Sequence, residues 1–262
     1  MADPISLFAA AVAGPDREVD LARAALAVAA GANPDLDPQP SLDALDRFAE
    51  GVGDLLGVRH RLFKELHFAG NAADYYDEEN SFLDRVIERR LGIPLTLSIV
   101  TMEVGHRAGV EFDGIGMPGH FVVRHRATEL FLDAFNGGDV LDEQECEARW
   151  RQVSGAGPNV PFLPAMLAPI GKRAILVRML TNLAGIYREQ ARFDCLEWVL
   201  RMRLEIPEVE REEALGLAET LAAMGRYQEA AVELESRATD DPEPGRSASF
   251  LTTARRMRAH LN

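Results

Sequence analysis

Gly-Ile-Pro-Leu-Thr-Leu-Ser, residues 92–98, is the stretch that decides the fold of this chain. Its glycine ends one predicted helix, and Pro94 suits the first turn of the next, because the N–H that proline lacks would have no intrahelical partner there. The apolar run that follows continues to Gly109, a residue typical of a helix end. The sequence therefore predicts a helix over 94–109 with a fixed starting point.

Helices are expected before this stretch and strands after it. Apolar residues spaced three to four apart predict helices at 4–13, 18–31, 41–57, 59–68 and 81–90. Alternating residues predict strands at 112–116, 121–125 and 129–135. Asn136-Gly137-Gly138 is expected to form the turn that closes the last strand, since glycine adopts positive φ without strain. Several helices followed by a small antiparallel sheet make an α+β fold.

A boundary between two domains is expected in residues 154–171, which are rich in glycine and proline. We therefore predict one domain over 1–160 and a second, helical domain over 161–262. In the second domain similar residues recur 34 or 35 positions apart, in the pairs Tyr187/Leu221, Phe193/Tyr227 and Pro207/Pro242. That spacing is the period of tetratricopeptide helix pairs, whose usual role is to bind another protein. A last helix over 247–261 is expected to cap the stack.

Composition argues against several classes of function. The chain has 42 acidic and 28 basic residues, a formal net charge of −14, so neither nucleic acid nor an anionic membrane is an expected partner. No apolar run approaches the ~18 residues of a membrane span, and the first residues lack the basic character of a signal peptide. Cys146 and Cys195 lie in stretches that read as helix, which favours a reducing compartment over a disulfide framework. A cytoplasmic location is predicted, and the oligomeric state is left open.

His120, which follows a Pro-Gly pair, and Asp133, in the last predicted strand, are the candidate catalytic residues. In a thiol acyltransferase a helix start lowers the pKa of the nucleophile, a histidine accepts its proton and an aspartate orients the imidazole. The predicted helix, His120 and Asp133 follow that order, but the helix contains no cysteine. Thr96 or Ser98 could supply a hydroxyl instead, which is far harder to deprotonate than a thiol.

Five stretches carry specific motifs: Phe-Ala-Gly-Asn (68–71), Tyr-Tyr-Asp-Glu-Glu-Asn-Ser (75–81), Arg-Arg-Leu-Gly-Ile-Pro-Leu-Thr-Leu-Ser (89–98), Gly-Met-Pro-Gly-His-Phe (116–121) and Leu-Asp-Ala-Phe-Asn-Gly-Gly (132–138). In these stretches and the helical repeats, the chain resembles the bacterial transglutaminase-like family with C-terminal tetratricopeptide repeats, whose members are often labelled homologues of an invasion-gene regulator. The resemblance implies a papain/transglutaminase-like core in which His120 and Asp133 take the catalytic positions. It places the nucleophile near Pro94 to Thr96, where this chain has no cysteine.

Further polar residues are candidates for the cleft that such a core would form. Asn80, Ser81, Ser98 and Asn136 are expected to line it, with a helix cap as the alternative role of Asn80 and Ser81. The adjacent tyrosines at 75–76 could stack on a ligand or pack the loop onto the core. The histidines show no metal-binding spacing such as HExxH, so no metal and no cofactor are expected.

Three functions follow from these observations. The favoured interpretation is a non-catalytic transglutaminase-like protein that acts as a protein-interaction or regulatory module, binding a partner protein through its cleft and its helical repeats. The first alternative is an amide hydrolase or transferase that uses a Thr or Ser nucleophile with His120 and Asp133. The second is a sensor that holds a peptide or an amino acid in the cleft.

Overall fold

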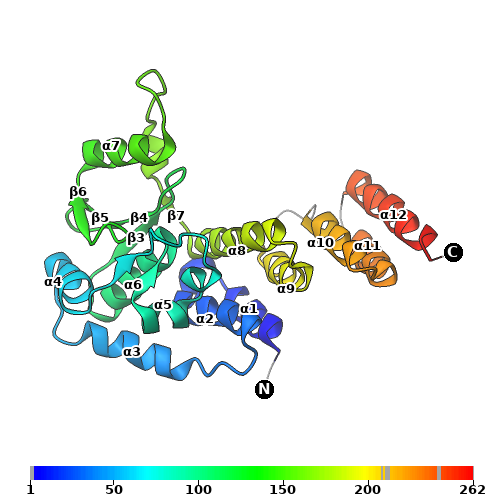
Figure 1. Ribbon diagram of the computed structural model, residues 1–262, viewed down its shortest axis with the longest axis horizontal. Coiled ribbons are helices and arrows are strands. Elements are labelled where there is room, and N and C mark those ends of the chain that lie inside the picture. Colours follow the sequence, from blue (N-terminus) through cyan, green and yellow to red (C-terminus); the bar gives the residue numbers. More distant parts are fainter. Residues whose placement is uncertain (1–2, 208, 210–212, 241–242, 262) are drawn as a thin grey trace.

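The structure is a computed structural model that describes residues 3–207, 209, 213–240 and 243–261. A body of helices around a small sheet forms the N-terminal part, and the last helices extend from this body to one side (Figure 1). The helices of the body are α1 (Pro4–Val12), α2 (Leu21–Ala32), α3 (Gln39–Ala49), α4 (Leu55–His60), α5 (Leu83–Arg89), α6 (Pro94–Arg107) and α7 (Glu143–Ser154), with 3₁₀ turns at Asp16–Glu18, Glu78–Ser81 and Pro164–Leu167 and a π-helical turn at Arg61–Glu65.

The main sheet has five antiparallel strands in the order β6-β5-β4-β3-β7. Their bounds are β3 Phe112–Ile115, β4 Val122–His125, β5 Phe131–Asp133, β6 Asp139–Leu141 and β7 Pro169–Ile170. The prediction of helices with a small antiparallel sheet is confirmed, and β3 to β5 coincide with the three predicted strands. The outer strands β6 and β7 were not predicted, because strands of three and two residues are too short to show alternation.

The single helix predicted over 41–57 is wrong: the structure has two helices there. Helix α3 ends at Ala49, and Gly51 adopts a φ of +72°, which a helix does not allow. Helix α4 begins after Asp54, its N-cap residue. The Asp54 carboxylate accepts a hydrogen bond of 2.7 Å from the Gly57 amide. The apolar spacing continues through this break, since both helices turn an apolar face to the same core.

Helix α6 runs through the centre of the body and is buried around nearly its whole circumference. It packs against α3, α4 and α5 as well as against β3 and β4. The chain enters it through a short parallel pairing of β1 (Ala69–Gly70) with β2 (Leu91–Gly92). Gly70 lies so close to the end of β5 that a Cβ there would come within 2.6 Å of the Phe135 carbonyl oxygen. The start of α6 is therefore fixed between the β1 loop and the sheet.

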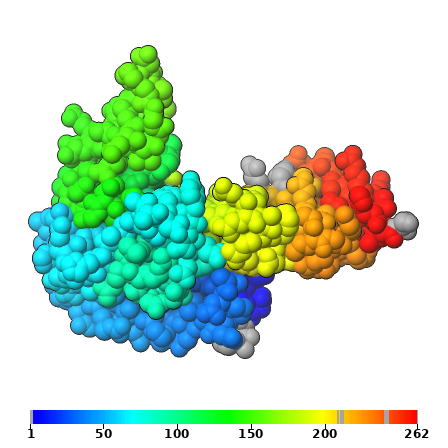
Figure 2. Space-filling model, viewed as in Figure 1, coloured from blue at the N-terminus to red at the C-terminus, as the bar shows by residue number. Residues whose placement is uncertain are grey.

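Helix α7 and the loop after it stand out from the body (Figure 1 and Figure 2). Helix α7 covers one face of the sheet, where Cys146 and Trp150 share a second apolar cluster with residues of β3, β4 and β5. Strand β7 belongs to the same sheet through its pairing with β3, so the sheet extends beyond residue 160. The predicted domain boundary at that residue stays a prediction.

The remaining chain is helical: α8 (Lys172–Glu189), α9 (Phe193–Leu204), α10 (Glu213–Ala223), α11 (Tyr227–Asp240) and α12 (Pro244–Ala259). Each of these helices packs on the next along the chain, and Figure 1 shows α10 to α12 reaching away from the body. Ala184 and Ala218, which the repeat pattern places at helix crossings, are fully buried. The last helix begins three residues before its predicted start at 247, and Pro242 lies outside the described residues.

Helices α8 and α9 are anchored on the body. Helix α8 packs against α2 and α6, and α9 packs against α1 and α2, so one apolar core continues from the body into these helices. Asp16 caps α8 from far away in the sequence: its carboxylate accepts hydrogen bonds from the Lys172 amide (3.1 Å) and the Arg173 amide (2.8 Å). None of the helices in the described ranges combines the length and the apolar character needed to cross a bilayer.

Candidate functional site

The structure brings His120 and Asp133 together. His120 Nε2 lies 2.9 Å from Asp133 Oδ2, and both residues are buried, with 4% and 0% of their surface exposed. The geometry follows from the sheet: Asp133 ends β5, and the chain reaches β4 through a turn in which Gly119 has a φ of +77°. Because β4 and β5 are antiparallel neighbours, the end of one lies beside the start of the other.

Asp133 has two further polar partners, a hydrogen-bond donor in Asn136 and an ion-pair partner in Arg149. Asn136 donates its side-chain amide to Oδ2 (2.8 Å) and its backbone amide to Oδ1 (3.2 Å), and Arg149 Nη1 lies 2.9 Å from Oδ2. Burial on its own raises the pKa of Asp133, but the hydrogen bonds from His120 and Asn136 and the charge of Arg149 outweigh burial and lower that pKa below its ordinary value. The carboxylate is therefore ionised at neutral pH.

Arg149 was missed by the sequence reasoning. It comes from α7, which lies across the sheet because Cys146 and Trp150 pack on it, and it also pairs with Asp139 at 3.1 Å. The signal in the sequence was a pair of arginines, Arg149 and Arg151, that follows three glutamates in one helical segment. The partner of Arg149 could not be identified from spacing, because the position of α7 is decided by packing.

Thr96 and Ser98 do not reach this pair. The Thr96 hydroxyl donates to the Asn80 carbonyl at 2.6 Å and accepts from the Ile93 amide at 3.3 Å, so it caps α6 and holds the preceding loop. The Ser98 hydroxyl is buried and has no hydrogen-bond partner in the described part of the chain. Among the described residues it is Pro94, and neither hydroxyl, that lines the hollow with His120.

Asn80 holds the loop that carries the two tyrosines. Its side chain is fully buried, accepts from Asn71 Nδ2 at 3.0 Å, and donates to the carbonyls of Asp74 (2.7 Å) and Tyr75 (3.3 Å). All of the hydrogen-bonding groups of this amide are thus used within the protein. The geometry gives Asn80 a positioning role, in place of the expected direct contact with the cleft.

The hollow above His120 measures about 560 Å³ and has an aromatic wall. Tyr75 contacts Tyr76 with ring centroids 5.3 Å apart, and Phe135 lies 6.0 Å from Tyr75 and 6.4 Å from His120. The described residues that line it are Tyr75, Tyr76, Pro94, Gly119, His120, Phe135, Asn136, Arg149, Gln152 and Val153. Asn136 therefore lies at the hollow as the sequence analysis expected.

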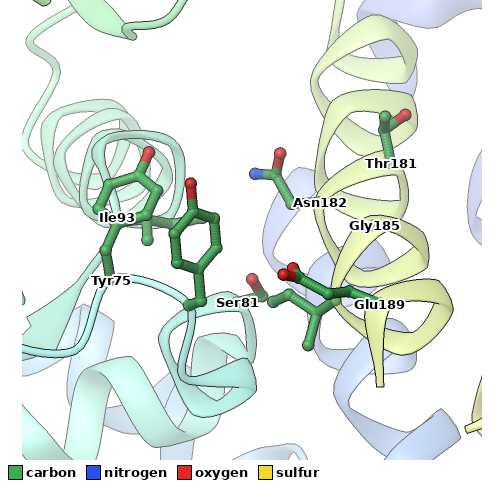
Figure 3. A pocket seen from close by; sticks show the side chains of 9 residues that line it. Tyr75, Ser81, Ile93, Thr181, Asn182, Gly185 and Glu189 are labelled. Carbon is green, nitrogen blue, oxygen red and sulfur yellow. The ribbon is translucent and has the colours of Figure 1, made fainter. Parts of the chain in front are cut away.

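A second hollow, of about 270 Å³, lies on the other side of the tyrosine pair, between the loop and α8 (Figure 3). We call it the α8 pocket. The described residues that line it are Tyr75, Tyr76, Ser81, Ile93, Thr181, Asn182, Gly185, Ile186 and Glu189. Tyr75 and Tyr76 line both hollows, so the two hollows adjoin at these side chains.

Neither cysteine is among the described residues that line the hollow with His120. Cys146 is fully buried, and burial together with Asp133 and the acidic residues of the α7 start raises its pKa to about 12. Burial also raises the pKa of Cys195, which lies in α9 beside Arg192. Within the described ranges no three His, Cys, Asp or Glu side chains are grouped so as to hold a metal ion.

Comparison with known proteins gives a family and several relatives. Residues 23–181 match the model of the Transglutaminase-like superfamily. A "UPF0162 protein" of Xylella fastidiosa (strain Temecula1) is 35% identical over 218 residues, which cover 76% of this chain and 78% of that protein. A "UPF0162 protein" of Vibrio cholerae is 30% identical over 137 residues, 51% of this chain and 50% of that protein. Human "F-box only protein 21" is 29% identical over 143 residues, 51% of this chain and 22% of that protein. No solved structure matches the chain.

Proposed function

We propose that this chain, which belongs to the transglutaminase-like superfamily and to the UPF0162 family, is a non-catalytic cytoplasmic protein that binds a partner protein through its cleft and its C-terminal helices. The observation that carries this proposal is the start of α6. The place beside His120 is lined by Pro94, which has no nucleophilic atom, and the hydroxyl of Thr96 is committed to capping the helix. The His120–Asp133 pair thus has no nucleophile to activate.

The requirements of acyl transfer explain why a proline beside His120 argues against catalysis. Such a reaction needs an attacking atom within hydrogen-bond reach of the base, about 2.6–3.2 Å. Thr96 would have to leave its 2.6 Å contact with the Asn80 carbonyl, and the capped end of α6 would lose a partner. We infer that the pair now holds the two strands and α7 together and presents one face of the imidazole to the hollow.

The C-terminal helices support the binding role. We propose that α8–α9 and α10–α11 are tetratricopeptide-like hairpins, with α12 as their cap, forming the domain predicted over 161–262. The 34-residue spacing of Phe193 and Tyr227 and the burial of Ala184 and Ala218 support this. Helical repeats offer an extended surface for a partner, and a regulatory role fits such a surface. Both cysteines are free, as is typical of a reducing compartment.

The first test measures catalysis directly. The full chain is assayed for transfer of a fluorescent amine to glutamine-containing casein and for hydrolysis of a mixed peptide library. We expect background rates for the wild type, the same rates for His120→Ala, and no change on alkylation of the thiols. An activity that disappears in His120→Ala and in Thr96→Ala or Ser98→Ala would overturn the proposal in favour of a hydroxyl-dependent enzyme.

The second test measures binding in the cell. A photo-crosslinking amino acid replaces Tyr76, which is 69% exposed at the cleft, or Thr181 on α8, and as a control Leu56, which is 62% exposed on α4. We expect the same protein adduct from the first two positions and none from the control. Equal adducts from all three positions, or none from any, would contradict a partner that binds at the cleft.

A further inference from the structure

The α8 pocket contains hydrogen-bonding groups that the chain itself does not use. Ser81 is only 1% exposed, and its hydroxyl projects toward the pocket (Figure 3). In the same view the Asn182 amide and the Glu189 carboxylate project from α8 toward the side of Tyr75. Among the residues that the structure describes, no side-chain hydrogen bond or ion pair involves Ser81, Asn182 or Glu189. Of these three residues Ser81 is buried, and a buried hydroxyl without a partner at a hollow points to a ligand.

The charged and polar residues that line the pocket indicate the charge of the ligand. Glu189 is the one ionisable acid or base, apart from the tyrosine hydroxyls, among the described residues that line it. Ser81 and Asn182 can both offer an oxygen as a hydrogen-bond acceptor. A carboxylate, two further acceptors and the faces of two tyrosines favour a cation, because an ammonium or guanidinium group is attracted both to carboxylates and to aromatic rings.

The apolar residues and the volume of the pocket indicate the shape of the ligand. Its apolar lining consists of Ile93, which immediately precedes α6, Ile186 on α8 and the rings of Tyr75 and Tyr76. The volume of about 270 Å³ is below the roughly 300–1,000 Å³ typical of pockets for whole drug-sized ligands. A long side chain with an apolar stem and a charged end suits such a hollow, since lysine and arginine pack their stems on apolar surface and keep the charge at a polar rim.

Gly185 leaves the backbone of α8 uncovered beside the pocket. Glycine in the interior of a helix lowers its stability relative to alanine, and Gly185 lies in the last third of the 18-residue helix α8. A Cβ at Gly185 would meet no atom within 4 Å, so packing inside the chain does not require glycine there. The backbone of α8 is therefore open to a ligand at this position.

We propose that the α8 pocket receives the arginine or lysine side chain of an extended basic segment of the partner protein. This inference rests on the proposed function, because it assigns one contact of the partner. The segment would continue across Tyr75 and Tyr76 into the hollow above His120, since these two side chains line both hollows. The net charge of −14 on this chain agrees with a basic partner.

The test uses the full chain and capped pentapeptides that carry arginine, citrulline, norleucine or glutamate between alanines. Binding is measured by isothermal titration calorimetry and by amide chemical shifts of α8. We expect the arginine peptide to bind more tightly than the other three. Glu189→Gln should weaken its binding by about five-fold, the upper range for exposed charged contacts, and Gly185→Ala should weaken it at least as much. Glu219→Gln and Gly216→Ala in α10 are the matched controls, because Glu219 is exposed and a Cβ at Gly216 also meets no atom within 4 Å.

The outcomes separate this inference from the proposed function. Equal binding of the arginine and norleucine peptides, no binding of any peptide, or unchanged affinity in Glu189→Gln would overturn the cationic contact. Free arginine amide bound as tightly as the peptide would overturn the assignment to a protein segment. In each of these cases a cross-linked adduct at Tyr76 and Thr181 would still support a protein partner. The loss of that adduct, and not the peptide result, is what contradicts the proposed function.

Discussion

Replacing Asp133 by alanine tests the reading of the buried pair as a structural network. The substitution removes the acceptor of His120 Nε2 (2.9 Å) and of two Asn136 groups (2.8 and 3.2 Å), and the ion-pair partner of Arg149 (2.9 Å). Leaving the buried His120 donor unpaired costs about 1–3 kcal/mol. Arg149 keeps its contact with Asp139, so its loss adds only about 1 kcal/mol. We expect the free energy of unfolding to fall by about 2–4 kcal/mol.

Urea unfolding followed by circular dichroism and by tryptophan fluorescence measures this loss, because Trp150 lies on α7 near the site. Asp133→Asn, which keeps the shape but not the charge, should lose less than Asp133→Ala. The matched control is Asp139→Asn, whose carboxylate is half exposed, with a loss of about 0–1 kcal/mol. A loss in Asp133→Ala no larger than that in Asp139→Asn would refute the network.

The pH dependence of this loss has a fixed sign. The pKa of Asp133 is lowered in the folded protein from the ordinary 3.8, so its charge stabilises the fold above pH values near 4. That contribution disappears as the pH falls from 3.8 through the lowered pKa of the folded state. The stability difference between wild type and Asp133→Asn should therefore shrink as the pH falls below about 4. A difference that grows as the pH falls below about 4 would contradict the assigned direction.

Four further perturbations test other parts of the fold. Asp16→Ala should destabilise the protein by about 1–2 kcal/mol in urea unfolding, because the first amides of α8 lose their cap; an unchanged midpoint would disprove the cap. Thr96→Val should cost about 1–2 kcal/mol through the loss of the α6 cap, and a neutral effect would show that water replaces the hydroxyl. In the native protein at pH 8, iodoacetamide should leave the buried Cys146 unmodified and react first with the partly exposed Cys195, as mass spectrometry of the digest will show; the reverse order would contradict the burial of Cys146. Truncation after Pro244 removes α12, including the fully buried Phe250, and should cause aggregation detectable by light scattering; a monomer with unchanged melting temperature would make α12 dispensable.

Local signals in the sequence were enough for the elements that build the centre of the site. Pro94 marks the first residue of α6, and positive φ occurs at Gly137 and Gly138 as the turn prediction required. The predicted meeting of His120 and Asp133 holds, because neighbouring antiparallel strands leave few other arrangements for residues at their ends. The catalytic or vestigial role of the pair stays a prediction.

The parts that escaped prediction depend on tertiary packing. Nothing local in the sequence of α7 shows that Arg149 turns toward Asp133, because that orientation follows from Trp150 packing on the sheet. The contact of Thr96 with the Asn80 carbonyl joins residues 16 positions apart and depends on the path of the loop between them. The α8 pocket combines residues near position 80 with residues near 185, a juxtaposition that exists only after α8 has packed on the body.

The cap that Asp16 places on α8 gives the chain an order of assembly. The first turn of α8 is completed by a carboxylate 156 positions earlier in the sequence, so the body must exist before the helical part has its correct starting point. During synthesis the ribosome delivers the body first, and each later helix then adds to a template already in place. Tension on the C-terminus acts in the reverse direction, so α12 detaches first and α8 last. Helix α8 is held longest because it packs on α2 and α6 and is also capped by Asp16. A protease that pulls the chain from that end would strip away the outer helices while the His120 hollow keeps its shape.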